Sequence, residues 1–274
     1  MCNSLITLPL ISAAISSITS QTGISGAFLL LPVQLSLLGI ESPVASSTNL
    51  LYNVVSTPGG IYRHWKENRL NPRLSAIILL GTIPGMLTGA WIRACFLPSP
   101  ETFRVFAGAV LLLISLRLIL SGICGKSRIP EKFEVSGANV SGMIYSYEFD
   151  GKVYRVKLIH IVPVAYAIGT VAGAYGVGGG AFLVPLLVSV FSLPVYTISG
   201  AVLLSTFVTS VLSSLFYAFL GYPPDILLGL LFGIGGVFGT YFGAGIQKML
   251  PERAIKTMLG LIVGIIALKY ITAI

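Results

Sequence analysis

Gly23-Ile-Ser-Gly-Ala-Phe-Leu-Leu-Leu-Pro32 returns later in the chain as Gly176-Val-Gly-Gly-Gly-Ala-Phe-Leu-Val-Pro185, 153 positions further on (23 to 176). In both stretches a glycine-rich break precedes a short apolar run that ends at a proline. A pattern that recurs at a fixed distance indicates an internal duplication. We therefore expect a fold built from two copies of one unit, each with this break near its start.

Three further landmarks repeat in the same order and support the duplication. They are Gly81, Gly85 and Gly89 with Gly235, Gly239 and Gly243, then Leu97-Pro98 with Leu250-Pro251, and Arg117 with Lys269. Their separations stay close to that of the two breaks (81 to 235, 97 to 250, 117 to 269). The sequence thus predicts a first repeat over 1–123, a linker over 124–157 and a second repeat over 158–274.

The composition indicates that both repeats lie in a lipid bilayer. Only 9% of the residues are charged and 55% are hydrophobic, with a mean hydropathy of +0.91, whereas soluble domains contain about 25% charged residues. The apolar runs are as long as helices and lack the polar–apolar alternation of barrel strands. The predicted fold class is therefore an all-α polytopic membrane protein with two transmembrane repeats.

Each repeat contains five apolar segments. The ten segments are 5–20, 27–38, 43–61, 74–92, 103–120, 159–175, 181–191, 195–220, 226–246 and 254–274. The second segment of each repeat falls well short of the about 20 residues that a membrane span requires. Because each of these short segments follows a glycine-rich break, we expect a broken or re-entrant hairpin at the start of each repeat.

The distribution of basic residues predicts the orientation. The net charge is +8, and the basic residues lie between apolar segments, which is typical of cytoplasmic loops rather than of nucleic-acid binding. The loops 63–73 and 124–157 are basic, whereas 94–101 and 221–225 contain no Lys or Arg. This pattern predicts a cytoplasmic membrane protein with a cytoplasmic central loop and both termini outside. Because each repeat then crosses an odd number of times, the two repeats should be inverted relative to each other.

The central loop contains a second structural signal. Polar and apolar residues alternate from Met143 to Val156 around Asp150-Gly151, and Asp-Gly between alternating runs predicts a β-hairpin. We expect a small cytoplasmic hairpin that acts as a spacer. A regulatory role for it is the alternative.

The glycine-rich breaks supply the first candidate binding residues, Ser25 and Gly26 in one copy and Gly178, Gly179 and Gly180 in the other. A helix that begins after such a break offers unpaired N–H groups and the positive end of its dipole, which suits an anion. The alternative is that the glycines only allow close helix packing. Two such helix ends meeting inside the membrane would bind an anion without Lys or Arg.

The third segments supply the remaining candidates. Their polar residues are Ser46, Ser47, Thr48, Asn49, Asn53, Ser56, Ser199, Ser205, Thr206, Thr209 and Ser210. We select Thr48, Asn49, Asn53, Ser205 and Thr206 as substrate-binding residues. Asn49 and Asn53 lie on one helical face, and an amide in lipid is costly to leave unpaired. The hydroxyl groups could instead bond to the preceding helical turn.

Several chemistries have no residues to support them. No Asp or Glu lies in the middle of a predicted span, which argues against a carboxylate-based cation site or proton relay. Cys2, Cys95 and Cys124 show no metal-ligand or redox spacing. We therefore expect no catalytic residue, no metal site and no cofactor, and the protein is predicted not to be an enzyme.

The motifs resemble those of the sulfite exporter TauE/SafE family. The resemblance rests on Gly176–Pro185, on Ser47-Thr48-Asn49-Leu50 and on the duplicated layout, and it covers nearly the whole chain except the central loop. It implies movement, in the direction of export, of sulfite, an organosulfonate or a related sulfur-containing anion across the cytoplasmic membrane. This chain departs from the pattern where Ser25 and Ala27 replace glycines and where Ser205-Thr206 replaces the Thr-Asn pair.

The predicted function is transport of a small anion by alternating access, in which one repeat rocks against the other. The expected partners are the anion and the lipid bilayer, with H⁺ or Na⁺ as candidate coupling ions and no nucleic acid. One alternative is a passive anion channel. Another is a membrane sensor or scaffold that acts through the central hairpin. The sequence makes no prediction of the oligomeric state.

Overall fold

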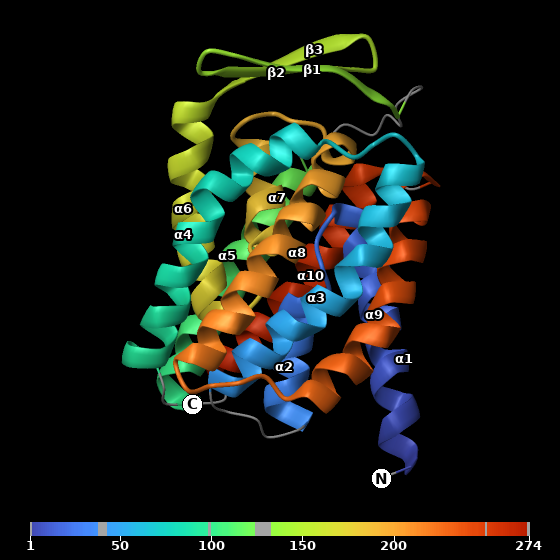
Figure 1. The fold of residues 1–274 in the computed structure, drawn as a ribbon. Coiled ribbons are helices and arrows are strands. Elements are labelled where there is room, and N and C mark those ends of the chain that lie inside the picture. Colours follow the sequence, from blue (N-terminus) through green and yellow to red (C-terminus); the bar gives the residue numbers. More distant parts are fainter. Residues whose placement is uncertain (1, 38–42, 98–99, 124–132, 250, 273–274) are drawn as a thin grey trace.

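The computed structural model describes residues 2–37, 43–97, 100–123, 133–249 and 251–272. Within these ranges the chain forms a bundle of ten α-helices with a small antiparallel sheet at one end (Figure 1). The start of α1 and the end of α10 both lie at the end of the bundle opposite the sheet (Figure 1). The relative placement of termini and central loop is the one that the charge pattern predicts, while their sides of the membrane stay a prediction.

All ten predicted segments form helices. The first half contains α1 (Cys2–Thr19), the short 3-10 helix η1 (Ser20–Thr22), α2 (Ala27–Leu37), α3 (Pro43–Lys66), α4 (Pro72–Phe96) and α5 (Pro100–Ile123). The second half contains α6 (Leu158–Tyr175), α7 (Gly180–Ser189), α8 (Val195–Phe219), α9 (Ile226–Ile246), η2 (Gln247–Met249) and α10 (Glu252–Thr272). The helices α2 and α7 have 11 and 10 residues, so both halves start with a long helix, a break and a short helix.

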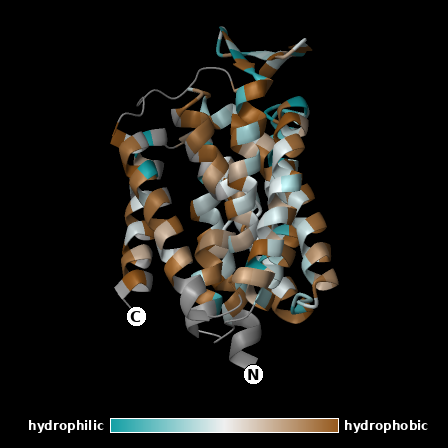
Figure 2. Ribbon diagram, turned by 90° about the vertical axis from the view of Figure 1, so that its left-hand side faces the viewer, coloured by the Kyte–Doolittle hydropathy of each residue, from teal (hydrophilic) through white to brown (hydrophobic). Residues whose placement is uncertain are grey.

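Four of the described helices are long and apolar enough to cross a membrane: α4, α6, α8 and α9. Figure 2 shows hydrophobic residues along the length of the outer helices and hydrophilic ones gathered mainly at the sheet and just beneath it. Helices of this composition are stable in lipid because their backbone N–H and C=O groups bond to each other within the helix. The chain is therefore a multi-pass membrane protein.

Two helix pairs use the repeated glycine triplets for close packing. Each glycine faces a backbone carbonyl of its neighbour: Gly81 with Val162, Gly85 with Tyr166, Gly89 with Thr170, Gly235 with Pro9, Gly239 with Ala13 and Gly243 with Ser17. The first triplet joins α4 to α6 and the second joins α9 to α1. A Cβ at any of these positions would collide with the facing backbone, so the small-residue stripes serve helix packing as predicted.

The other helix contacts also occur in equivalent pairs, one in each half of the chain. The helix α3 packs on α9 and α8 packs on α4, while α3 also contacts α8 and α5 contacts α10. The counterpart of each helix is the one five positions later or earlier, so α3 corresponds to α8 and α4 to α9. The contact of α3 with α9 therefore corresponds to that of α8 with α4. The core is thus assembled from helices of both halves and cannot be divided between them.

The sheet contains the predicted hairpin and one strand more. Its strands β1 (Val135–Ser141), β2 (Ile144–Phe149) and β3 (Lys152–Lys157) pair antiparallel in that order. Asp150 and Gly151 form the β2–β3 turn with φ of 49° and 69°, the left-handed values that a two-residue hairpin requires. The strand β1 was not predicted, because its residues show no clear alternation and its pairing with β2 is interrupted between Ser136 and Asn139.

Two buried tyrosines fix the sheet to the bundle. The Tyr145 hydroxyl donates to Asn71 Oδ1 at 2.6 Å, and the hydroxyls of Tyr147 and Thr197 share a hydrogen bond of 2.8 Å. Burial raises the pKa of Tyr145 to about 12 and also raises the pKa of Tyr147. Asn71 caps α4, and Thr197 lies in the first turn of α8. The sheet therefore ties together one helix from each half.

Candidate substrate-binding site

The two glycine-rich breaks meet inside the bundle. The carbonyl oxygen of Gly23 lies 3.9 Å from the position that a Cβ would occupy on Gly180. Gly23 packs against Ser199 of α8, and Gly176 packs against Ser46 of α3 in the matching way, with φ of 76° and 81°. Left-handed backbone and close contact with a neighbouring helix together explain why glycine occupies both positions.

Asn49 connects the two breaks. Its Nδ2 donates to the carbonyl oxygen of Ala27 at 2.9 Å and to that of Gly176 at 2.8 Å. The side chain is fully buried, and its Oδ1 has no hydrogen-bond partner among the described residues. A predicted site residue therefore lies at the junction and holds the start of α2 against the end of α6.

The N-terminus of α7 is surrounded by buried polar groups. Ser210 Oγ and Asn53 Nδ2 lie 2.7 Å and 3.0 Å from the position of a Cβ on Gly178, and Thr206 Oγ1 lies 2.9 Å from that on Gly180. Thr206, Ser210 and Asn53 are at most 1% exposed, and these side-chain atoms have no partner within the described part of the chain. Leaving a buried polar group unpaired costs about 1–3 kcal/mol, so the cluster is suited to a bound ligand.

Gly179 faces open space at this same helix end. It is the N-cap residue of α7, and no side chain caps the helix. Although the residue is buried, a Cβ on it would meet no atom within 4 Å. The first N–H groups of a helix have no intrahelical acceptor. These donors and the adjoining space make the start of α7 the most accessible part of the junction.

The N-terminus of α2 resembles that of α7 but is packed more tightly. Ser25 is 1% exposed, and its Oγ has no partner among the described residues. A Cβ on Gly26 would lie 2.8 Å from the Tyr52 hydroxyl and 2.9 Å from Ser16 Oγ, which are themselves hydrogen-bonded at 2.7 Å. The first break therefore contributes donors to the junction but little room.

Thr48 and Ser205 form hydrogen bonds that point away from the junction. The N–H of Asp225, before α9, donates to Thr48 Oγ1 at 2.9 Å. Ser205 donates to the carbonyls of Ala201 at 2.9 Å and of Ser75 at 3.4 Å, on the side of α4. The junction thus brings together eight of the ten predicted site residues, Ser25, Gly26, Asn49, Asn53, Gly178, Gly179, Gly180 and Thr206, with Ser210 in addition.

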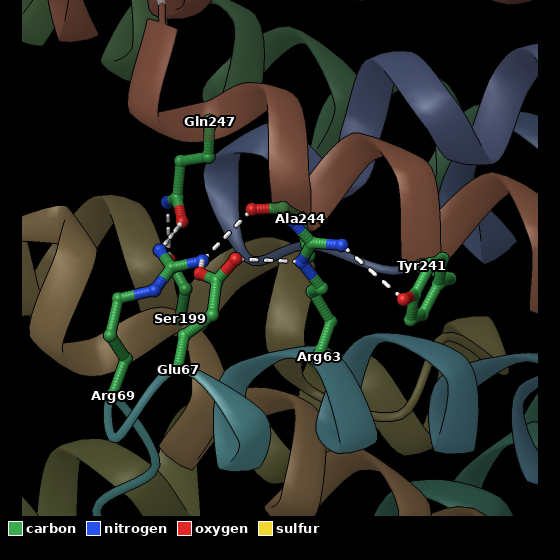
Figure 3. Close-up of polar contacts among 7 residues, drawn as sticks. All are labelled: Arg63, Glu67, Arg69, Ser199, Tyr241, Ala244 and Gln247. Atoms are coloured by element: carbon green, nitrogen blue, oxygen red, sulfur yellow. Dashed lines mark hydrogen bonds and ion pairs between the residues drawn. The ribbon is translucent and has the colours of Figure 1, made fainter.

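A buried polar network lies between the junction and the sheet (Figure 3). Arg69 is fully buried, and it donates to Gln247 Oε1 at 2.8 Å, to the Ala244 carbonyl at 2.9 Å and to the carboxylate of Glu67. Gln247 Nε2 in turn donates to Ser199 Oγ at 2.9 Å. Burial lowers the pKa of the Arg69 guanidinium, and the neighbouring Glu67 opposes this effect. The network connects the α3–α4 connection, η2 and α8 at the sheet end of the bundle.

Glu67 extends the network to a second arginine. Arg63 Nε donates to Glu67 Oε1 at 2.7 Å, and Arg63 Nη1 donates to the Tyr241 hydroxyl at 3.3 Å (Figure 3). The network thereby spans the end of α3, the α3–α4 connection, α9 and η2. Because Ser199 also packs against Gly23, the first break is supported directly by these contacts.

Arg93 is a buried cation that the sequence analysis did not select. It is fully buried near the end of α4 away from the sheet, and the phenols of Tyr217 and Tyr222 lie within electrostatic range. Its position in the repeat corresponds to that of Gln247 (93 + 154 = 247). The sequence contains a signal for this burial, because Arg93 follows Gly89 by four residues and so lies on the same inward-facing side of α4 as the glycine triplet.

Broken apolar helices that meet around a buried polar cluster define a multi-pass membrane transporter. A family model described as "Sulfite exporter TauE/SafE" matches residues 8–270. The chain therefore belongs to the sulfite exporter TauE/SafE family, as the motifs had indicated. The family is one of membrane transporters and not of enzymes, which confirms that prediction.

Related proteins of Bacillus subtilis (strain 168) carry the same type of description. "Probable membrane transporter protein YunE" is 23% identical and covers 97% of this chain and 96% of its own. "Probable membrane transporter protein YjnA" is 22% identical and covers 97% and 99%. "Probable membrane transporter protein YdhB" is 30% identical over 33% of this chain and 37% of its own. No solved structure gives a significant match.

Proposed function

We propose that this protein carries a small anion, namely sulfite, an organosulfonate or a related sulfur-containing anion, across the cytoplasmic membrane in the direction of export. The observation that carries the proposal is the start of α7, where open space at Gly179 adjoins the unpaired side chains of Asn53, Thr206 and Ser210. Sulfite and the direction of export come from the description of the family, and the wider class of sulfur-containing anions is the one that the motif resemblance implies.

The electrostatics of the junction support an anion. The uncapped N-terminus of α7 and the start of α2 present N–H groups and the positive ends of two helix dipoles. Hydroxyl and amide donors stand beside them. A carboxylate or a metal cluster that would favour a cation is not found among the described residues near the breaks. When an anion binds here, these donors take the place of the water molecules that hydrated it.

Alternating access between two inverted repeats is the mechanism that we propose. The exchange of contacts between the halves supports it, since α1 packs on α9 as α6 packs on α4. The helix α3 ends near the sheet, whereas its counterpart α8 begins there, which is the relation expected for inverted repeats. In this arrangement the substrate lies where the two repeats meet.

The orientation proposed for the membrane places the sheet in the cytoplasm and both termini outside. The basic loop 63–73 and the described part of the basic linker, 133–157, lie at the sheet end, and cytoplasmic loops carry such an excess of Lys and Arg. The buried Arg69 network then lies on the cytoplasmic side.

The test is sulfite efflux from proteoliposomes that contain purified protein. Thr206→Val and Gly179→Val should each lower efflux about tenfold or more, because the first removes a donor and the second fills the space at α7. Ser205→Ala, whose hydroxyl bonds toward α4, is the matched control and should retain efflux. Wild-type efflux through both site variants would show that the anion does not pass this junction.

A gradient experiment separates the transporter from the channel. Imposed H⁺ or Na⁺ gradients should drive sulfite uphill if a coupling ion is used, whereas a channel only dissipates the sulfite gradient. If neither gradient drives sulfite uphill and efflux is nevertheless fast, the protein is a channel or a uniporter and not an ion-coupled transporter.

A further inference from the structure

The junction contains acceptors as well as donors, and this combination narrows the substrate class. Asn49 is the decisive residue, because its Nδ2 is bonded to two backbone carbonyls. A carbonyl can only accept, so the amide cannot be turned over without losing both bonds. The other amide atom of Asn49 is therefore the oxygen, Oδ1, which can only accept a hydrogen bond.

This acceptor has no protein partner in the described residues although the side chain is fully buried. The amide of Asn53 has neither of its atoms paired, so it can offer an acceptor or a donor. A ligand made only of acceptor oxygens would satisfy the donors of the junction and leave these acceptors unpaired.

The charge available at the junction is about one unit. In the described part of the chain, the side chains against the two breaks are uncharged: Ser16, Tyr52, Ser46, Asn53, Ser199, Val202, Thr206 and Ser210 among them. Each helix N-terminus is equivalent to roughly half a positive charge, and two of them meet here. They balance a monoanion, whereas a dianion would leave one negative charge uncompensated in a medium of low dielectric constant.

We infer that the site selects singly charged oxyanions that carry an O–H or N–H donor of their own, over dianions and over monoanions without a donor. This inference rests on the proposed function of the junction. Hydroxylated sulfonates and the singly protonated form of sulfite belong to the selected class. Sulfate and unsubstituted alkanesulfonates do not.

A matched pair of ligands tests the donor requirement. Binding of 2-hydroxyethanesulfonate and of 1-propanesulfonate to purified protein is measured by titration calorimetry, since the two differ by a hydroxyl in place of a methyl. The hydroxylated ligand should bind about tenfold tighter or more, because a site with unpaired polar groups rejects the analogue that cannot pair them. Equal affinity, or tighter binding of 1-propanesulfonate, overturns the inference.

Sulfate and sulfite test the charge requirement. Sulfate should bind at least about tenfold more weakly than 2-hydroxyethanesulfonate. Sulfite should bind more tightly on the acidic side of its second titration than on the alkaline side, while the affinity for 2-hydroxyethanesulfonate stays constant over the same pH range. Sulfate that binds as tightly as the hydroxylated sulfonate, or sulfite affinity that rises with its second charge, overturns the inference.

The same experiments distinguish the two proposals. If sulfite and the sulfonates bind and compete but show no preference for a donor or for a single charge, the inference fails and anion transport stands. If none of these anions binds or crosses the proteoliposome membrane, the proposed function fails and the inference fails with it.

Discussion

The two glycine-rich breaks follow one plan, but their surroundings differ. At the second break a Cβ on Gly179 would meet nothing, and Thr206 and Ser210 are unpaired. At the first break Gly26 is packed against Tyr52 and Ser16, which bond to each other. The difference indicates that the two breaks took different roles after the duplication. The first break holds the junction together, and in the proposed function the second break provides the space for the substrate.

The same contrast appears in the two asparagines of α3. Asn49 is bonded to both breaks, whereas Asn53 points at the second break and has no partner in the described residues. One turn of helix thus separates an amide that holds both breaks through its Nδ2, with only its Oδ1 unpaired, from an amide with neither atom paired in the described residues.

The largest expected effect comes from breaking the anchor. Asn49→Ala removes the hydrogen bonds to the carbonyls of Ala27 and Gly176. The Gly176 carbonyl loses this donor, whereas the Ala27 carbonyl also accepts within α2, so the free energy of unfolding should fall by about 2–4 kcal/mol. Asn53→Ala is the control, because it removes no bond within the described protein, and it should cost less than about 1 kcal/mol while sulfite efflux falls. Thermal unfolding in detergent measures both. A comparable loss in the two variants would remove the distinction between the asparagines.

The next effect separates the two breaks by their glycines. Gly23→Ala would place a Cβ 2.5 Å from Ser199 at a φ of 76°, so overpacking and backbone strain add to about 3 kcal/mol or more. Gly179→Ala has free space, with φ of 82° and ψ of −31°, so its cost should be the backbone strain alone, about 1–3 kcal/mol.

The unfolding midpoints of these two alanine variants decide whether the first break is the tighter one. Gly179→Ala should retain most of its stability, and its efflux reports whether one added methyl disturbs the site. If Gly23→Ala proves the milder substitution, the first break cannot be the anchor.

Much of this architecture was predictable from the sequence. The breaks at Gly23 and Gly176 located the starts of α2 and α7, because a left-handed backbone and close approach both select glycine. The hairpin turn at Asp150-Gly151 was specified by local chemistry as well. These features depend on residues that are near one another in the chain.

The rotation of each helix was harder to predict. A polar residue on the inner side of a helix can face the junction or another neighbouring helix, and the sequence pattern does not distinguish the two. Thr48 and Ser205 were therefore expected at the site, yet Thr48 accepts from Asp225, 177 positions away (48 to 225), and Ser205 bonds toward α4. The burial of Arg93 was not predicted, because Arg93 lies between the predicted segment 74–92 and the loop 94–101, where a charged side chain is normally exposed.

A smaller effect should distinguish Thr206 from Ser210 within the second break. Thr206 Oγ1 lies nearest to Gly180, the first residue of α7, and Ser210 Oγ lies against Gly178. Thr206→Val and Ser210→Ala should each change the free energy of unfolding by no more than about 1 kcal/mol, because neither hydroxyl has a partner among the described residues. Substrate affinity should fall about fivefold to tenfold in each variant. Calorimetric titration with sulfite measures the loss, and unchanged affinity in both would move the substrate away from the second break.

The smallest effect concerns the sheet, which is bonded to the starts of α4 and α8. Tyr145→Phe removes the bond to Asn71 Oδ1 and should lower the free energy of unfolding by about 1 kcal/mol, since Asn71 keeps its capping bond with the Leu74 N–H. Burial raises the pKa of Tyr145 to about 12 from its ordinary value of 10.0. The unfolded chain therefore loses this proton first, so the contribution of Tyr145 is constant below pH 10 and declines as the pH rises toward 12.

Unfolding of the wild type and of Tyr145→Phe at several pH values checks this dependence. The stability difference between the two should shrink or reverse above pH 10, since phenylalanine does not titrate. Substrate affinity should be unaffected in Tyr145→Phe, because the hydroxyl bonds to the α4 cap and not to the junction. If this variant lost substrate affinity as strongly as Thr206→Val, the sheet would be coupled to the second break, and the contrast between an anchoring break and a binding break would not hold.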